Sequence, residues 1–275
     1  MEANIFQYDF IVKGLLGAIF ASITAGLAGR YVVSKRMVFL SGGITHASFG
    51  GIGIGYFIGI NPVVGAAIFG IMAALGVEYL SVKQKIREDS AIGILWAFGM
   101  AIGIIFIYLT PGYTPNLMSY LFGSILTVTN ADLIALGTMS LILILYFSIF
   151  YRTILYISFD EVFARTYSSY VNLFKYFTTS LIALTIVLNI RMAGVVLVIS
   201  LLTIPPNIAM LFTKIYFKIV VWSILAGFVG TATGYVISYF AGIPVGATII
   251  FTLVIIWVIS KGISQLLMKL SKRKK

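Results

Sequence analysis

Long, nearly continuous runs of apolar residues fill this chain and constrain its fold more than any other feature. Hydrophobic residues make up 60% of its 275 positions and charged residues only 10%. Soluble domains contain about 45–50% and about 25%, respectively. A helix of about 20 apolar residues crosses the hydrocarbon core of a bilayer. We therefore expect an all-α, polytopic transmembrane helical bundle that forms a single domain over residues 1–275.

The pattern within the runs excludes the other membrane-spanning architecture. A transmembrane β-barrel would show segments of about 10 residues with alternating polarity. Stretches such as "SLILILYFSIFY" and "ATIIFTLVIIWVIS" are apolar at odd and even positions alike. The sequence therefore predicts helices.

Charged or turn-rich breaks divide the chain into nine apolar runs. We expect nine crossings, with eight as the alternative, at approximately residues 10–30, 38–59, 62–82, 90–110, 131–150, 172–190, 193–213, 218–241 and 244–262. The stretch 111–130 is too broken for a crossing and too apolar for an ordinary loop. A short re-entrant or interfacial helix at 118–128 fits it, because irregular backbone is tolerated at membrane depth where protein covers it.

Basic residues orient the chain in the membrane. With nine crossings, all of the 19 Lys and Arg residues except Lys13 and Arg191 lie on the same side. Positive charge is retained on the cytoplasmic side. We therefore expect a multi-pass protein of a prokaryotic inner membrane with its N-terminus outside and a basic cytoplasmic tail at 263–275. The net charge of +11 then reflects topology in the lipid bilayer, with no nucleic-acid partner.

Glycines recur at helical spacing in the second run. Gly51, Gly55 and Gly59 are four residues apart. Small residues on one face let helix backbones approach closely in lipid. We interpret these glycines as helix-packing residues, with the lining of a pathway as the alternative.

His46 is the only histidine of the chain and lies within the same run, in "LSGGITHASFGGIGIG". An ionisable side chain at membrane depth usually faces the bundle interior or a watery path. Neutral imidazole also binds zinc, manganese and iron, and the absence of cysteine excludes thiolate ligands. The alternative is a structural histidine that is hydrogen-bonded within the bundle.

A cytoplasmic segment at 151–170, "YRTILYISFDEVFARTYSSY", mixes charged and apolar residues. Glu161 and Arg165 are four residues apart, as in a helical ion pair. The segment could lie on the bilayer, but its acidic residues oppose contact with anionic lipid and favour a protein partner. The docking residues that we predict are Asp160, Glu161, Phe163, Ala164 and Arg165.

The chain lacks the motifs of an enzyme. No GxxxxGK[ST] phosphate loop is present, so energy for any transport must come from another subunit or from an ion gradient. A single histidine, with no Ser, His and Asp set at recognisable spacing, makes a hydrolytic centre improbable.

Several motifs resemble, in order, those of one transporter family. "FLSGGITHASFGGIGIGYFIGINP" at 39–62 resembles the signature around its second helix. "REDSAIGILWAFGMAIGIIF", "SYLFGSIL", "FDEVFARTYS", "AGVVLVISLLTIPPNIAML" and "GIPVGATII" resemble later segments. On these residues the chain is similar to the permeases of zinc- and manganese-type metal-importing ATP-binding-cassette (ABC) transporters, the ABC-3 permeases.

This resemblance implies the partners and the cargo. The permease would resemble a type II ABC importer and move a divalent zinc, manganese or iron ion into the cytoplasm as a transported substrate. It would act as a homodimer with two cytoplasmic ATP-binding subunits on the coupling segment and an extracytoplasmic metal-binding protein. ATP would be bound and hydrolysed in the partner subunits, with no cofactor in this chain.

The resemblance also assigns site residues. It places His46 in the translocation path as a transient metal contact. The family's Asp four residues before this histidine is Gly42 here, so either another oxygen donor compensates or the cargo differs. Thr45, Ser41 and Asn61 are the candidate oxygen donors in the path. The alternative function is a stand-alone secondary transporter or channel in which His46 relays an ion or a proton.

Overall fold

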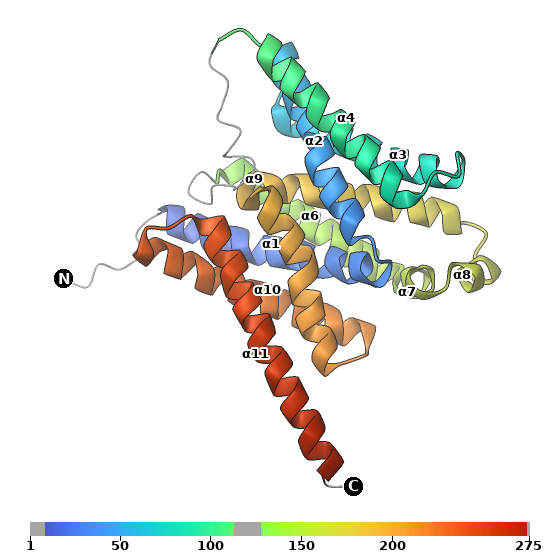
Figure 1. Ribbon diagram of the computed structural model, residues 1–275, viewed down its shortest axis with the longest axis vertical. Coiled ribbons are helices and arrows are strands. Elements are labelled where there is room, and N and C mark those ends of the chain that lie inside the picture. Colours follow the sequence, from blue (N-terminus) through green and yellow to red (C-terminus); the bar gives the residue numbers. More distant parts are fainter. Residues whose placement is uncertain (1–8, 113–127, 274–275) are drawn as a thin grey trace.

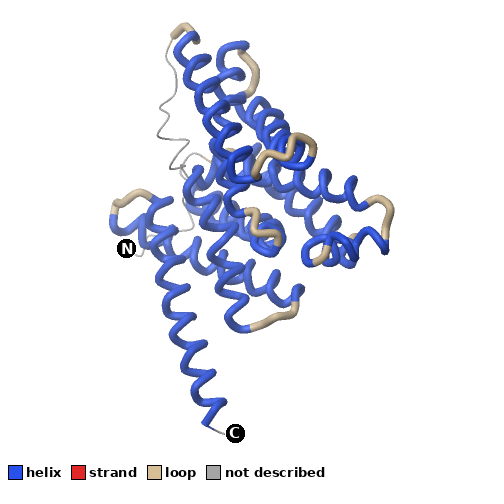
Figure 2. Tube along the Cα trace, turned by 45° about the vertical axis from the view of Figure 1, so that its right-hand side comes forward, coloured by secondary structure: helices blue, strands red, loops and turns tan. Residues whose placement is uncertain are grey.

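The computed structural model describes residues 9–112 and 128–273, and these residues form helices joined by short turns (Figures 1 and 2). The helices are α1 (Asp9–Ser34), α2 (Val38–Ile58), α3 (Pro62–Val82), α4 (Glu88–Leu109), α6 (Asn130–Ile149), α7 (Tyr151–Phe159), α8 (Glu161–Tyr167), α9 (Val171–Phe212), α10 (Tyr216–Ala241) and α11 (Val245–Arg273). The prediction of an all-α bundle is confirmed for this part of the chain. The short helix expected at 118–128 falls, except for its last residue, outside the described residues.

Within the described part, seven helices are long and apolar enough to cross a membrane: α1, α3, α4, α6, α9, α10 and α11. Helix α2 has 21 residues but is not among them, because its Gly, Ser, Thr and His residues lower its hydropathy. Helix α9 has 42 residues and is interrupted at Gly194, whose φ of 76° and ψ of 162° are not helical. The runs expected at 172–190 and 193–213 therefore form two arms of one element, which changes direction at this glycine (Figure 1).

The helices fall into two packed groups around α9. In the first group, α2, α3 and α4 pack together, and α2 and α3 also contact α9. In the second group, α1, α10 and α11 each contact α9. Figure 1 shows the first group at the top and α11 reaching away at the bottom. In the apolar part of α9, 72% of the residues are buried, against 17% in α4. The core therefore lies along α9, and α4 presents most of its surface outward.

Glycines bring α2 into backbone contact with both of its neighbours. A Cβ atom at Gly51 would overlap the backbone of Gly65 on α3, and one at Gly53 would overlap the backbone of Gly103 on α4. A Cβ at Gly55 would meet Pro62 Cα at 3.0 Å. This is the close approach that small residues permit in lipid.

Gly59 has a different role from the packing that its spacing predicted. It ends α2 with a left-handed φ of 77°, and nothing lies within 4 Å of a Cβ built there. Its backbone N–H donates to carbonyl oxygens of the last turn, as in a glycine C-cap. The packing interpretation is wrong for this residue.

The glycine contacts predict opposite effects of the same substitution at two positions. Gly51→Ala should lower the stability of the protein by about 1–3 kcal/mol, the cost typical of overpacking. Gly93→Ala should raise it by up to about 1 kcal/mol, because nothing lies within 4 Å of a Cβ at Gly93. Thermal unfolding in one detergent measures both. Equal stability of the two variants would contradict the close contact.

Candidate translocation site and cytoplasmic docking segment

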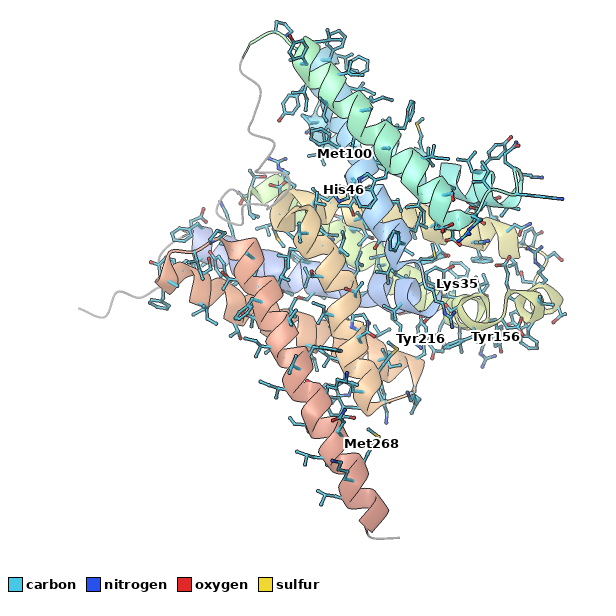
Figure 3. The ribbon with its side chains drawn as sticks, in the orientation of Figure 1. Lys35, His46, Met100, Tyr156, Tyr216 and Met268 are labelled. Carbon is cyan, nitrogen blue, oxygen red and sulfur yellow. The ribbon has the colours of Figure 1, made fainter. Side chains whose placement is uncertain are left out.

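The His46 side chain lies at the boundary between α2 and α4. Its ring stacks on that of Trp96 from α4, with centroids 4.2 Å apart and planes 8° from parallel. The side chain is half-buried. Figure 3 shows His46 on α2 close to the helix that carries Met100. The indole therefore fixes the plane of the imidazole while part of the ring stays accessible.

The two predicted hydroxyl donors near His46 are buried and bonded within their own helix. Ser41 Oγ donates to the Val38 carbonyl oxygen at 2.7 Å, and Thr45 Oγ1 donates to the Ser41 carbonyl oxygen at 2.5 Å. Only 1% of Ser41 and 2% of Thr45 is exposed. Both hydroxyl hydrogens are therefore already in hydrogen bonds. Both residues are buried, whereas His46 is partly accessible.

Asn61 is not brought to His46. Fifteen residues separate the two along α2 and the following turn, about 22 Å at the rise of a helix. The Asn61 side chain instead accepts a hydrogen bond from the Val63 N–H at 2.9 Å and caps α3. Asn61 thus caps α3 at a distance from His46, and a role for it in the path stays a prediction.

Gly42 precedes His46 by one helical turn and has space for a side chain. The nearest atom to a Cβ built there is Ile199 Cδ1, at 3.7 Å, an ordinary van der Waals contact. The space at this position is bounded by the part of α9 that follows Gly194, which we call the inner arm of α9. A carboxylate at residue 42 would share one face of α2 with His46.

The inner arm of α9 carries polar residues that the sequence interpretation missed. Ser200, Thr203 and Asn207 follow at spacings of three and four, so they share one helix face. Ser200 and Thr203 are half-buried and Asn207 is exposed. The Asn207 Nδ2 donates to the Thr203 carbonyl oxygen at 2.8 Å. The spacing of these polar residues within an otherwise apolar run could have revealed this face in the sequence.

One chain does not assemble a complete set of strong metal ligands within the described residues. No group of three or more His, Asp and Glu side chains is close enough there to hold an ion. His46 therefore remains a predicted metal contact, with the oxygen atoms of the α9 face as further candidates. Imidazole and neutral oxygen are ligands for several divalent metals.

The segment at 151–170, which the sequence predicts to be cytoplasmic, folds into two short helices, α7 and α8. Asp160 lies between them and accepts a hydrogen bond from the Phe163 N–H at 2.9 Å, so it is the N-cap of α8. Ala164 is 2% exposed and faces the bundle. Two of the five predicted docking residues thus serve the local fold.

Apolar side chains form the outer surface of this segment. Val162 is 76% exposed, Phe163 50% exposed and Tyr167 55% exposed. We call these three residues the outer face of α8. Such a cluster at the end of a helical hairpin is typical of an interaction site.

Glu161 belongs to the inner face and binds three cations. Its carboxylate lies 2.9 Å from Arg165 Nη2, 3.4 Å from Lys35 Nζ and 3.6 Å from Lys175 Nζ. Lys175 also pairs with Glu78 of α3. Burial alone would raise the pKa of the Glu161 carboxyl, but the surrounding cations outweigh it and hold that pKa below its ordinary value.

The long apolar helices of the described residues define a multi-pass membrane protein. Comparison with known proteins refines this class. The chain matches the ABC 3 transport family over residues 7–263, and it therefore belongs to that family.

Known relatives agree with this assignment. The chain is 38% identical to a membrane protein of Synechocystis over 254 residues, 92% of this chain and 90% of that one. It is 33% identical to the manganese transport system membrane protein MntC of Listeria monocytogenes, over 94% of this chain and 91% of that one. The solved structure of PsaBC from Streptococcus pneumoniae in complex with Fab matches with a TM-score of 0.84 and 28% identity, covering 93% and 92% of the two chains. The family and these relatives support a permease of a metal ABC transporter.

The cations around Glu161 predict that α8 is held less firmly in acid. A carboxyl whose pKa is lowered in the folded state stabilises that state fully above its ordinary pKa of 4.5 and loses this contribution as the pH falls through the lowered value. Deuterium-exchange protection of the α8 amides should therefore drop below pH 4.5. Glu161→Gln should remove this pH step, and a step that persists in this variant would contradict the assignment.

Proposed function

We propose that this chain is the membrane-spanning permease subunit of an ABC importer that carries a divalent transition metal ion into the cytoplasm. The outer face of α8 supports the proposal most directly, because it offers a protein partner an apolar surface on a chain that has no phosphate loop of its own. The ATP-binding subunits would dock there. Manganese is the first cargo to test, since the Listeria relative is named for manganese transport, and zinc and iron are its competitors.

The proposed topology has nine crossings. The seven long apolar helices contribute seven, the second arm of α9 beyond Gly194 adds an eighth, and α2 adds the ninth. The N-terminus would lie outside and the C-terminus in the cytoplasm. Helix α11 runs through to Arg273, so the basic tail at 263–275 would continue from the last crossing into the cytoplasm.

The proposed path begins at His46 and continues along the inner arm of α9. The chain direction supports this order, because α2 leaves the cytoplasmic side while the arm of α9 beyond Gly194 returns to it. Ile199 bounds the space at Gly42, and Ser200, Thr203 and Asn207 then lie progressively closer to the cytoplasm. Polar side chains exposed on a membrane helix are expected to line water or protein. A second copy of the chain would complete the path.

His46 substitutions test the path. His46→Ala should reduce metal uptake by at least about tenfold, since even outer-shell changes at metal sites cost about 10–100-fold. Ser48→Ala is the matched control on α2, because the Ser48 hydroxyl is bonded to the Ile44 carbonyl oxygen, and it should transport normally. Gly42→Asp should tighten metal binding to the purified transporter, measured by titration. Normal uptake by His46→Ala would remove His46 from the path.

Val162→Asp tests the docking site. A carboxylate placed in an apolar interface without a partner costs several kcal/mol, so the ATP-binding subunit should no longer co-purify with the permease. Val82→Asp is the matched control, because Val82 is 55% exposed at the end of α3, and this variant should retain the subunit. Asp160 and Glu161 are unsuitable for this test because they cap and anchor α8. Co-purification with Val162→Asp would contradict docking on α8.

A further inference from the structure

Four charged side chains from four separate segments meet beside α8. Glu161 contributes from α8, Glu78 from α3, Lys175 from the first turns of α9, and Lys35 from the turn between α1 and α2. Their side chains are only 14–28% exposed. Ion pairs that are partly removed from solvent are screened less than surface pairs. We call this group the charge hub.

Lys35 holds a distinct position within the charge hub. It directly follows α1, where its N–H donates to the Tyr31 carbonyl oxygen at 2.9 Å, and it lies three residues before the start of α2. Lys175 and Glu78, in contrast, belong to helices already packed against each other. The Lys35 Nζ contacts Glu161 Oε2 at 3.4 Å. This ion pair therefore joins α8 to the entrance of the helix that carries His46 (Figure 3 labels both Lys35 and His46).

The turn around Lys35 and the packing of α2 suit the transfer of a displacement. Arg36 has a left-handed φ of 59°, a conformation that disfavours non-glycine residues, so the turn is held away from its preferred geometry. Helix α2 is fixed to α3 and α4 by backbone contacts at its glycines. A shift at Lys35 would therefore move α2 as a unit with its neighbours, because packed helices do not deform continuously.

We propose that Lys35 is a positioning residue of the transport cycle, which transmits the movement of α8 through its ion pair with Glu161 to α2 and thereby to His46. The inference rests on the proposed function of α8 as the docking site of the ATP-binding subunits. It adds the structural connection through which docking on α8 affects the proposed translocation path.

The other contacts of α8 distinguish a role of Lys35 in transmitting movement from a role in anchoring α8. Without Lys35, α8 keeps the contact of Glu161 with Lys175 and the hydrogen bond from Arg165 to Asn172 at 3.0 Å. Ala164 stays buried. Loss of Lys35 should therefore leave α8 in place and the subunits bound, and should weaken only the link to α2.

The test uses the whole transporter, permease with its ATP-binding subunits, in proteoliposomes. Lys35→Met removes the charge, Lys35→Arg keeps it, and Lys83→Met is the matched control, since Lys83 is an exposed lysine at another cytoplasmic turn. The measured quantity is manganese ions transported per ATP hydrolysed. Lys35→Met should lower this ratio by about fivefold or more, at the lower end of couplings between linked sites. Lys35→Arg and Lys83→Met should keep the wild-type ratio.

The outcomes distinguish the two proposals. An unchanged ratio in an assembled Lys35→Met transporter overturns the role of Lys35, while loss of the subunit in Val162→Asp still supports docking. Retention of the subunit in Val162→Asp overturns docking itself. If Lys35→Met does not assemble, Lys35→Gln decides, because it removes the same charge, keeps a polar side chain and leaves the contacts of Glu161 with Lys175 and Arg165 in place. It should lower the ratio, and an unchanged ratio would overturn the proposal.

Discussion

Backbone contact through glycine holds α2 between α3 and α4, and the position of each candidate path residue on α2 depends on it. Lipid offers little hydrophobic drive for helix association, so close packing of small residues carries more of the stability than in water. Gly51 meets Gly65, and Gly53 meets Gly103. This geometry brings α4 near enough for Trp96 to stack on His46. A bulkier helix would lose both the contact and the orientation of the imidazole.

The hydrogen bonding of polar groups in the described part reflects the same environment, a medium without water. Hydroxyl groups on the helices bond to carbonyl oxygens of the preceding turn, as Ser41, Thr45 and Ser48 do, because unpaired polar groups are costly in hydrocarbon. Charged groups collect at helix ends, and the hub around Glu161 lies where α8 meets the bundle. Its ion pairs cross between segments distant in sequence. It therefore joins the surface proposed for the ATP-binding subunits to the helix proposed to carry the ion.

Local features were predictable from sequence and long-range ones were not. Apolar runs located the helices, and the mixture of Phe, Val, Asp and Glu located α8. The spacing of Gly51, Gly55 and Gly59 could not reveal that the last of these ends a helix with nothing packed on it. Lys35 and Glu161 are 126 residues apart, so no local pattern predicted their pairing. Asn61 was assigned to the path by residue type alone, and its cap on α3 shows only in the fold.

The central claim is that the chain carries a metal ion only when ATP-binding subunits drive it. Radioactive manganese uptake into proteoliposomes tests this directly, with the permease alone and with its ATP-binding subunits, each with and without ATP. The account predicts accumulation only in the complete transporter supplied with ATP. Uptake by the permease alone, driven by a proton or sodium gradient, would contradict it and favour a secondary transporter.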